Sequence, residues 1–322
     1  MRISARVIVS VVTWNSEKDI KQCLDALAAQ TYTDYRVVVV DNNSEDHTEK
    51  MVRGFADVVY IQKNNNTGYS VAHNEVIRST DSVYVLCLNP DVVLQKDFIK
   101  ELVTYADRYP KGGSFGGLLF RPADLKTGAR FDIVDSAGLT LLPWRQVVNR
   151  GEGKAITDAN MNPGMVFGHS GACVLYRRNA LETVKYGSEY FDTDFFAYKE
   201  DADLAWRLHN AGYSAGYAPL ARAYHRRAIQ STHGLISGRL TTRSRDIRVY
   251  SYRNHILMLL KNERLRSLVL YAPVVGLYEL CKFIFLLFTD TSVLISALSQ
   301  IFHLAPEILK KRNSFAEKTH NQ

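Results

Sequence analysis

Short, continuously apolar segments alternate with amphipathic segments through the first hundred residues. The apolar segments have the β-branched composition of buried strands and cover residues 5–12, 35–40, 57–61 and 82–88. The segments between them space their apolar residues at helical intervals and cover residues 16–30, 44–56 and 68–79. Strands that are apolar throughout and alternate with helices predict a parallel sheet with helices on both faces.

Three polar loops directly follow apolar runs of this predicted sheet. They are Thr13-Trp14-Asn15, residues 41–44, and Asn89-Pro90-Asp91. In such sheets ligands bind beyond the carboxyl ends of the strands. We therefore expect these loops to form one binding edge.

The pattern changes in the second half of the chain. Residues 112–175 give only short strand signals, and residues 195–213 predict a helix that has acidic residues in its first turn and ends at Gly212. Residues 268–288 are almost as long and apolar as a membrane span, but Pro273, Glu279 and Lys282 interrupt them. A clean transmembrane span is therefore the less favoured interpretation, and an amphipathic stretch follows.

Composition and charge narrow the class of protein. The chain has 322 residues, 46% of them hydrophobic, and a net charge of +7, which are values of a globular protein. Eleven Lys and Arg stand against two Asp and Glu between residues 221 and 266, which suits an anionic partner or a solvated basic surface. The four cysteines are scattered and predict reduced thiols in a cytosolic protein, and the start of the chain predicts a first strand rather than a signal peptide.

Several common motifs are absent from the sequence. No G-x-G-x-x-G follows the first strand, and no P-loop sequence occurs, which excludes the usual dinucleotide and P-loop nucleotide sites. The segment G-H-S-G-A at 168–172 misses the nucleophile elbow by its last glycine, so we do not expect Ser170 to be a hydrolase nucleophile.

Single carboxylates are ambiguous when each is taken alone. Asp41 is more often a turn residue that ends a strand than a ligand-binding group. Glu200, Asp201 and Asp203 could simply stabilise the start of their helix, or one of them could be a general base. His225 could be a metal ligand, a phosphate donor or a surface histidine.

The order of these motifs resembles the family 2 inverting nucleotide-sugar glycosyltransferases. The motifs run T-W-N, D-N-N-S, N-N-N-T-G-Y-S-V-A-H-N, N-P-D, G-H-S-G-A, E-D-x-D-x-x-x-R and a late histidine. The resemblance covers about residues 5–260 and is greatest to bacterial rhamnosyltransferases that build lipid-linked surface polysaccharides. It implies an α/β fold of GT-A type, which is a Rossmann-like, mixed, mainly parallel sheet flanked by helices. We accordingly expect a catalytic domain over 1–260 and a helical extension over 261–322 that associates with membranes or oligomerises.

The resemblance implies a role for each matching residue. The donor-binding residues would be Thr13, Trp14, Asn15, Asp41, Asn66, Gly68, Asn74 and Asn89. Asp91 and His225 would hold Mg²⁺ or Mn²⁺. Asp201 would be the base that deprotonates the acceptor hydroxyl, with Glu200 and Arg207 orienting it. Residues near the acceptor would be Asp135, Ser136, Gly138, His169 and Ser170.

The expected donor is dTDP-rhamnose, with a UDP-hexose or UDP-galactofuranose as alternatives. The expected acceptor is a saccharide, either free or carried on a lipid diphosphate. The C-terminal helices would place the protein on the cytoplasmic face of the membrane, or else form a homodimer interface or pack on the catalytic domain. Nucleic acid is not an expected partner. Two other functions stay open. One is a non-catalytic nucleotide- or carbohydrate-binding scaffold. The other is a nucleotidyltransferase, which is expected to have a glycine-rich loop with Lys or Arg after the first strand, whereas this chain has "TWNSE" there.

Overall fold

The computed structural model describes residues 3–121, 133–156, 162–226 and 245–320. These residues divide into two compact units. Unit 1 covers residues 1–140, 149–196 and 200–227, and unit 2 covers residues 141–148, 197–199 and 228–322. Residues 227–244, a part of the basic segment 221–266 noted in the sequence, lie outside the described residues.

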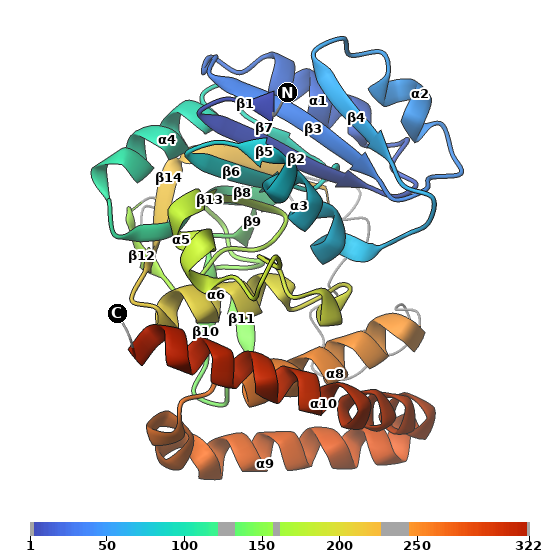
Figure 1. Ribbon diagram of the computed structural model, residues 1–322, viewed down its shortest axis with the longest axis vertical. Helices are drawn as coiled ribbons and strands as arrows, with labels where there is room; N and C mark the ends of the chain where they lie inside the picture. The colour runs from blue at the N-terminus through green and yellow to red at the C-terminus, as the bar shows by residue number, and fades with distance from the viewer. Residues whose placement is uncertain (1–2, 122–132, 157–161, 227–244, 321–322) are drawn as a thin grey trace. The chain divides into compact units, whose positions relative to one another are not determined.

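Unit 1 is built on a large mixed sheet (Figure 1). Its strands lie in the order β12 (Gly164–Val166), β14 (Ser214–His225), β8 (Gly112–Arg121), β13 (Cys173–Arg177), β6 (Tyr84–Leu88), β2 (Val7–Thr13), β3 (Tyr35–Asp41) and β4 (Val58–Gln62). Off this path, β7 (Val92–Leu94) pairs with β14, and β9 (Ile133–Ser136) pairs with β8. Short pairs are formed by β1 (Ile3–Ser4) with β5 (Thr80–Asp81), and by β10 (Leu139–Leu141) with β11 (Val147–Asn149).

The predicted parallel arrangement describes the N-terminal half of this sheet. Strands β6, β2, β3 and β4 are parallel, whereas β13 runs antiparallel to both β6 and β8. The antiparallel strand turns the middle of the chain back across the sheet. It thereby brings residues 168–172 to the same edge as the carboxyl end of β6.

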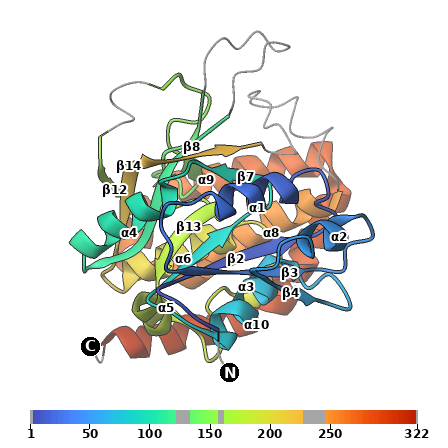
Figure 2. The ribbon, with the colours of Figure 1, turned by 90° about the horizontal axis from the view of Figure 1, so that it is seen from above.

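Helices cover both faces of the sheet (Figure 2). The helices of unit 1 are α1 (Ile20–Ala28), α2 (Thr48–Val52), α3 (Gly68–Ser79), α4 (Phe98–Arg108), α5 (Arg178–Val184) and α6 (Glu200–Asn210), with a short 3₁₀ turn η2 (Thr193–Phe195). One core cluster contains alternate residues of β2 with apolar side chains of α1 and α4, and a second contains Ile8 and Val38 with Ala72 and Val76 of α3. The strands are buried on both faces, which is why they are apolar throughout.

Unit 2 is helical. It contains α8 (Arg245–Asn262), α9 (Leu265–Thr289) and α10 (Thr291–His320). A small core joins Val249 and Tyr252 of α8 to Val293, Leu294 and Ala297 of α10. Because α8 packs on α10, the compact units divide at residue 227, whereas we expected the catalytic region to extend to residue 260. Residues 266–289 and 291–315 are each long and apolar enough to cross a membrane by length and composition.

Candidate active site

The N-P-D loop joins β6 to β7 as a tight turn. The backbone N–H of Val92 donates to Asn89 O over 3.2 Å, and the N–H of Asn89 donates to Ala172 O over 2.8 Å. The Asp91 carboxylate, 19% exposed, sits at the end of this turn. Its Oδ1 is buried and has no hydrogen-bond partner among the described residues. A buried carboxylate oxygen without a partner is costly, so it indicates a place for a cation or a donor group.

His225 lies beside Asp91 because β14 ends where β7 begins. His225 is in register with Val92, and its Nε2 lies 3.4 Å from Asp91 Oδ2. Its Nδ1 lies 2.7 Å from Asp135 Oδ2. Burial disfavours the charged ring, but hydrogen bonds to Asp135 and Asp91 and the charges of both outweigh burial and raise the pKa of His225 to about 9. The surroundings of this ring therefore stabilise positive charge.

Asp135, predicted near the acceptor, lies beside His225. Its carboxylate is buried and binds His225, while Oδ1 accepts a hydrogen bond from Arg121 Nε over 2.8 Å. Arg121 also donates to Glu152 over 3.0 Å. Asp135 thus supports His225 from behind, and its contact with the acceptor stays a prediction.

Ser136 and Gly138, also predicted near the acceptor, belong to the turn after Asp135. Ser136 is buried, and its hydroxyl donates to the Gly138 carbonyl over 3.1 Å. Gly138 has φ +99°, which the left-handed turn requires. The Ser136 side chain is used within its own turn, and the contacts of Ser136 and Gly138 with the acceptor stay predictions.

Asp201 lies in the first turn of α6, half-buried. Its Oδ2 accepts a hydrogen bond from Gly171 N over 2.8 Å, and its Oδ1 accepts one from Ala202 N over 2.7 Å. Gly171 precedes Ala172, whose carbonyl holds Asn89. Two adjacent residues therefore connect the predicted base to the loop that carries Asp91.

The start of α3 reaches the same place. Tyr69 Oη donates to Gly171 O over 2.9 Å, and Tyr69 N donates to Phe196 O over 3.0 Å. Gly68 has φ +80°, and a Cβ on it would lie 2.5 Å from Phe196 O. Asn66 Oδ1 accepts from Gly68 N over 2.9 Å and so stabilises this helix start. The sequence segment N-N-N-T-G-Y is therefore tied to the residues around Asp201.

The predicted nucleotide residues lie at the carboxyl ends of β2 and β3. Thr13 and Asp41 are fully buried, and Thr13 Oγ1 donates to Asp41 Oδ1 over 2.7 Å. Asp41 also accepts from Ser44 and Tyr60. Trp14 is 58% exposed directly beside this network. Asp41 therefore shapes the loop in this conformation, and direct donor binding by Thr13 and Asp41 stays a prediction.

Two more residues that were predicted to bind the donor, Asn15 and Asn89, lie in loops at the carboxyl ends of the strands. Asn15, with φ +50°, accepts a hydrogen bond from Glu45 N through its side chain, which ties the loops after β2 and β3 together. The Asn89 side chain is partly buried in the N-P-D turn. Their contacts with the donor remain predictions.

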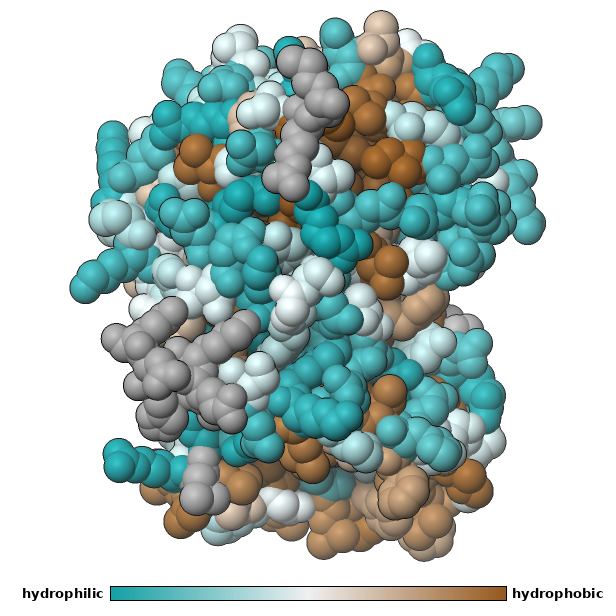
Figure 3. Space-filling view, in the orientation of Figure 1, coloured by the Kyte–Doolittle hydropathy of each residue, from teal (hydrophilic) through white to brown (hydrophobic). Residues whose placement is uncertain are grey.

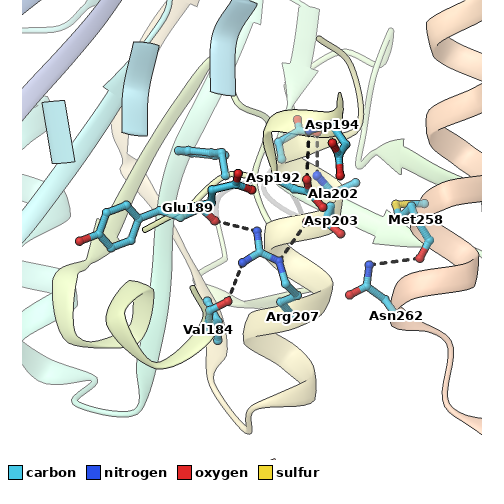
Figure 4. Close-up of polar contacts among 12 residues, drawn as sticks. Val184, Glu189, Asp192, Asp194, Ala202, Asp203, Arg207, Met258 and Asn262 are labelled. Carbon is cyan, nitrogen blue, oxygen red and sulfur yellow. Dashed lines mark hydrogen bonds and ion pairs between the residues drawn. The ribbon is translucent and has the colours of Figure 1, made fainter. Parts of the chain in front are cut away.

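Arg207, predicted to orient Asp201, is held within the protein. Figure 4 shows its guanidinium surrounded by Asp203 and backbone carbonyls. Arg207 donates to Asp203 Oδ2 over 2.9 Å and to the carbonyls of Val184 and Tyr190 over 2.7 Å each, and it is fully buried. It anchors α6 to the segment before it, and its role in orienting Asp201 stays a prediction.

Asn74 is a second predicted ligand with a structural role. Its side chain is fully buried, accepts hydrogen bonds from Tyr190 N and Phe191 N, and donates to Phe191 O over 2.7 Å. Asn74 holds residues 190–191 against α3, and its contact with the donor stays a prediction.

His169, predicted near the acceptor, is buried. The ring is 3% exposed, and a Cβ on Gly116 would lie 2.3 Å from its Nδ1. Burial, countered in part by the Gly216 backbone, lowers the pKa of His169 to about 3. Ser170 beside it is partly exposed, whereas the other residues of the 168–173 turn are buried. The contacts of His169 and Ser170 with the acceptor stay predictions.

The metal-binding prediction rests on two side chains. Among the described residues no group of three or more His, Cys, Asp or Glu is arranged to hold an ion. Asp91 and His225 are the pair that fits, and oxygen atoms of a diphosphate are suitable ligands to complete a shell.

Sequence reasoning missed the residues that join these parts. Gly171 and Ala172 were noted only as part of the G-H-S-G-A segment and given no role of their own, although their backbone groups connect Asp201 to Asn89. Backbone contacts leave no side-chain signature. Arg121 gave no signal either, because its partner Asp135 is fourteen residues away.

The chain matches two family models. Residues 8–185 match the model described as Glycosyl transferase family 2, and residues 148–309 match the model described as Glycosyl transferase family group 2. The N-acetylglucosaminyl-diphospho-decaprenol L-rhamnosyltransferase of Mycobacterium tuberculosis is 26% identical over 242 residues, which cover 68% of this chain and 76% of the relative.

Solved structures show the same fold. GalNAc-T7 with UDP, GalNAc and Mn²⁺ matches 80% of this chain and 48% of its own, at 12% identity and a TM-score of 0.60. The mannosyltransferase PcManGT from Pyrobaculum calidifontis, in complex with GDP-Man and Mn²⁺, matches 95% of this chain and 77% of its own, at 18% identity and a TM-score of 0.55. Together with the mixed sheet, these likenesses confirm the predicted GT-A fold class.

Proposed function

Because the chain belongs to glycosyl transferase family 2, we propose that it transfers rhamnose from dTDP-rhamnose to a lipid-linked saccharide with inversion. The observation that supports this proposal best is the connection between two sites. The Asp91–His225 pair and the Asp201 carboxylate are linked through the backbone of residues 171–172. A charge-stabilising site and a base joined in this way suit a single displacement reaction.

Asp91 and His225 would hold Mg²⁺ or Mn²⁺. The buried Oδ1 of Asp91, without a partner among the described residues, and the surroundings that raise the pKa of His225 support a cation there. When bound, such an ion supplies positive charge for the departing diphosphate. Asp135 would orient the His225 ring from the far side.

Asp201 would take the proton of the acceptor hydroxyl as that oxygen attacks the anomeric carbon. The new bond joins the acceptor oxygen to the sugar, the bond from the sugar to the diphosphate breaks, and the nucleoside diphosphate leaves. The attack comes from the side opposite the diphosphate, so the anomeric configuration inverts. The N–H of Gly171 and the start of α6 hold the ionised carboxylate in place for this step.

The choice of donor follows the rhamnosyltransferase relative. The exposed Trp14 ring, beside the buried Thr13–Asp41 pair, offers an aromatic face for a pyrimidine base. A UDP-hexose or UDP-galactofuranose is the alternative, since all of these donors carry a pyrimidine and a diphosphate.

We also propose that unit 2 lies on the cytoplasmic face of a membrane. Helix α9 has large apolar side chains that are strongly exposed, such as Leu270 at 73%, Leu277 at 64% and Phe288 at 82%. Figure 3 shows apolar side chains gathered over the surface where α9 lies. Apolar residues that face outward over a whole helix indicate a partner for that surface.

The charged residues in the middle of α9 face inward instead. Glu279 binds His255 of α8 over 2.7 Å and Lys282 over 3.1 Å, and Lys282 lies 5.1 Å from the Tyr252 ring. This part of the helix therefore directs its charge into unit 2 and exposes apolar groups. This distribution supports a helix with its outer face in lipid rather than a span.

Basic residues adjoin one end of this apolar surface. Arg312 of α10 donates to the carbonyls of Leu260 and Glu263 over 2.6 and 2.7 Å, which brings it to the turn between α8 and α9. Arg264 and Arg266 are exposed at the same turn. Cations beside exposed apolar groups favour an anionic lipid surface.

The function is tested with purified protein, Mn²⁺ or Mg²⁺, and a panel of nucleotide-sugars, with and without lipid-diphosphate saccharides. We expect release of nucleoside diphosphate that needs both dTDP-rhamnose and the acceptor, and an inverted linkage in the product. The variant Asp201→Asn should bind nucleoside diphosphate normally and lose transfer by a factor of about 10² or more. Normal transfer by this variant would overturn the base assignment.

The same assay separates the other function classes. A binding scaffold would bind the donor and transfer nothing with any acceptor. A nucleotidyltransferase would release pyrophosphate from a nucleoside triphosphate. Preference for a UDP-sugar would change the donor and leave the reaction class intact.

A further inference from the structure

The segment directly before Asp201 has an unusual backbone. Phe196, Tyr198 and Lys199 have φ of 56°, 71° and 73°, in the left-handed region, and none of them is glycine. Side-chain-bearing residues adopt this conformation at a cost in free energy, so the surrounding structure must hold them. Helix α6 begins at the next residue, Glu200.

One end of this segment is held within unit 1. The Phe196 carbonyl accepts the hydrogen bond from Tyr69 N over 3.0 Å. Gly68 lies so close to the Phe196 carbonyl that no Cβ would fit between them. This contact fixes residue 196. It does not involve residues 197–199, which follow.

Those three residues belong to unit 2, where Asn254 of α8 holds them. Asn254 Nδ2 donates to Ala197 O over 2.9 Å and to Tyr198 O over 2.7 Å. Its Oδ1 accepts from Arg253 Nε over 2.8 Å, which sets the amide with its nitrogen toward the two carbonyls. The Asn254 side chain is fully buried.

The chemistry of this contact is specific to a primary amide. A single –NH₂ group provides two hydrogens for two consecutive carbonyls, while the oxygen of the same side chain accepts from Arg253. A carboxylate of the same shape has no hydrogen to give and would repel both carbonyls.

We infer that Asn254 is a positioning residue for the transfer reaction. It holds residues 197–199 and, through the covalent chain, sets the place of the Asp201 carboxylate three residues beyond Tyr198. The inference rests on the proposed function, in which Asp201 is the base. It assigns to the helical unit a part in catalysis in addition to membrane binding.

The experiment compares Asn254→Asp with Asn262→Ala in the full chain. Asn262 is a matched control, because it is also a buried asparagine of α8 but donates to Met258 O in its own helix over 3.1 Å (Figure 4). We expect Asn254→Asp to lower kcat between about tenfold and a hundredfold, because a small misplacement of a reacting group has effects of this size. The KM for the nucleotide-sugar and the Kd for nucleoside diphosphate should stay within about twofold, since the donor residues lie elsewhere. Asn262→Ala should leave kcat within about twofold.

The contrast between kcat and donor binding separates positioning from a loss of folding. If Asn254→Asp does not fold, Asn254→Ala, which introduces no charge, is judged by the same criteria. A normal kcat in the variant overturns the inference, and so does an equal fall in kcat and in the fraction of protein that binds nucleoside diphosphate.

The variant Asp201→Asn, measured in the same assay, distinguishes this inference from the proposed function. If Asp201→Asn is inactive and Asn254→Asp is normal, only the role of Asn254 is lost, whereas an active Asp201→Asn removes the proposed base.

Discussion

Asp135 holds His225 by a 2.7 Å hydrogen bond to Nδ1, and it leaves Nε2 of the ring directed to Asp91. A carboxylate behind a histidine fixes the tautomer and orientation of a metal-binding ring. We predict that Asp135→Asn weakens Mn²⁺ binding by about 10–100-fold in the presence of nucleoside diphosphate, measured by calorimetry. The control Glu152→Gln changes a residue one contact further away, beyond Arg121, and should alter the affinity by less than about threefold. Equal affinities for Asp135→Asn and the wild type would show that His225 needs no such support.

The small number of protein ligands gives a second prediction. Asp91 and His225 are the two side chains proposed to hold the ion, and among the described residues no group of three or more His, Cys, Asp or Glu is arranged to hold one. We expect weak Mn²⁺ binding to the protein alone and much tighter binding once nucleoside diphosphate adds its oxygen ligands. Calorimetric titrations with and without nucleoside diphosphate measure the difference. Tight binding to the protein alone would mean that further ligands are present.

Gly68 and Gly212 form a matched pair for testing the α3 contact. Their φ angles are +80° and +84°, so alanine is strained at either position, by about 1–2 kcal/mol. Only at Gly68 does a Cβ also meet a backbone atom, 2.5 Å from Phe196 O, while nothing lies within 4 Å at Gly212. We predict that Gly68→Ala destabilises the protein more than Gly212→Ala in urea unfolding and also lowers kcat. If both variants lose the same stability and keep full activity, the close approach has no functional role.

The sequence predicted the fold well because the strands of unit 1 are buried on both faces. Runs such as Val37–Val40 can be recognised without any long-range information, because every side chain in them is apolar. The polar loops were also found correctly, since Asp91 follows such a run. The antiparallel strand β13 was not foreseen, because its pairing with β6 and β8 depends on contacts far apart in the sequence.

The internal hydrogen bonds of the candidate site could not be predicted from the sequence, for a physical reason. Residue type does not tell whether a polar side chain faces a ligand or completes an internal hydrogen-bond network. Asn74, Asp135 and Arg207 carry the same groups as ligand-binding residues, yet all three are buried and bonded to the protein itself. Burial and hydrogen-bond partners make this distinction, and both come only from the fold.

The buried histidines predict how stability depends on pH. His73 is fully buried against Ser10 Oγ at 2.7 Å, and burial lowers its pKa to about 3. Between about pH 6.5 and 3 the unfolded chain binds a proton at His73 and the folded chain does not. The stability from the neutral ring is therefore fully present above pH 6.5 and is lost as the pH falls, at up to about 1.4 kcal/mol per pH unit.

The variant His73→Gln isolates this effect. We expect it to be less stable than the wild type at pH 7.5, because a buried contact is altered, and to lose stability less steeply between pH 6.5 and 5. Urea unfolding at a series of pH values gives both slopes. Parallel curves for the two proteins would contradict a protonation of His73 that is linked to unfolding.

The exposed apolar face of α9 predicts how the protein meets a membrane. Leu270 and Leu277 are 73% and 64% exposed, so glutamate at these positions should fold normally and be repelled by anionic lipid. We predict that the double variant Leu270→Glu, Leu277→Glu binds anionic vesicles at least tenfold more weakly than the wild type in a sedimentation assay. Leu220→Glu is the matched control, because Leu220 is 65% exposed on β14 of unit 1 and should not affect binding. The other outcome is a wild type that does not bind vesicles but forms a dimer, together with a double variant that is monomeric. That result would show that the α9 face binds a second copy of the chain instead of lipid.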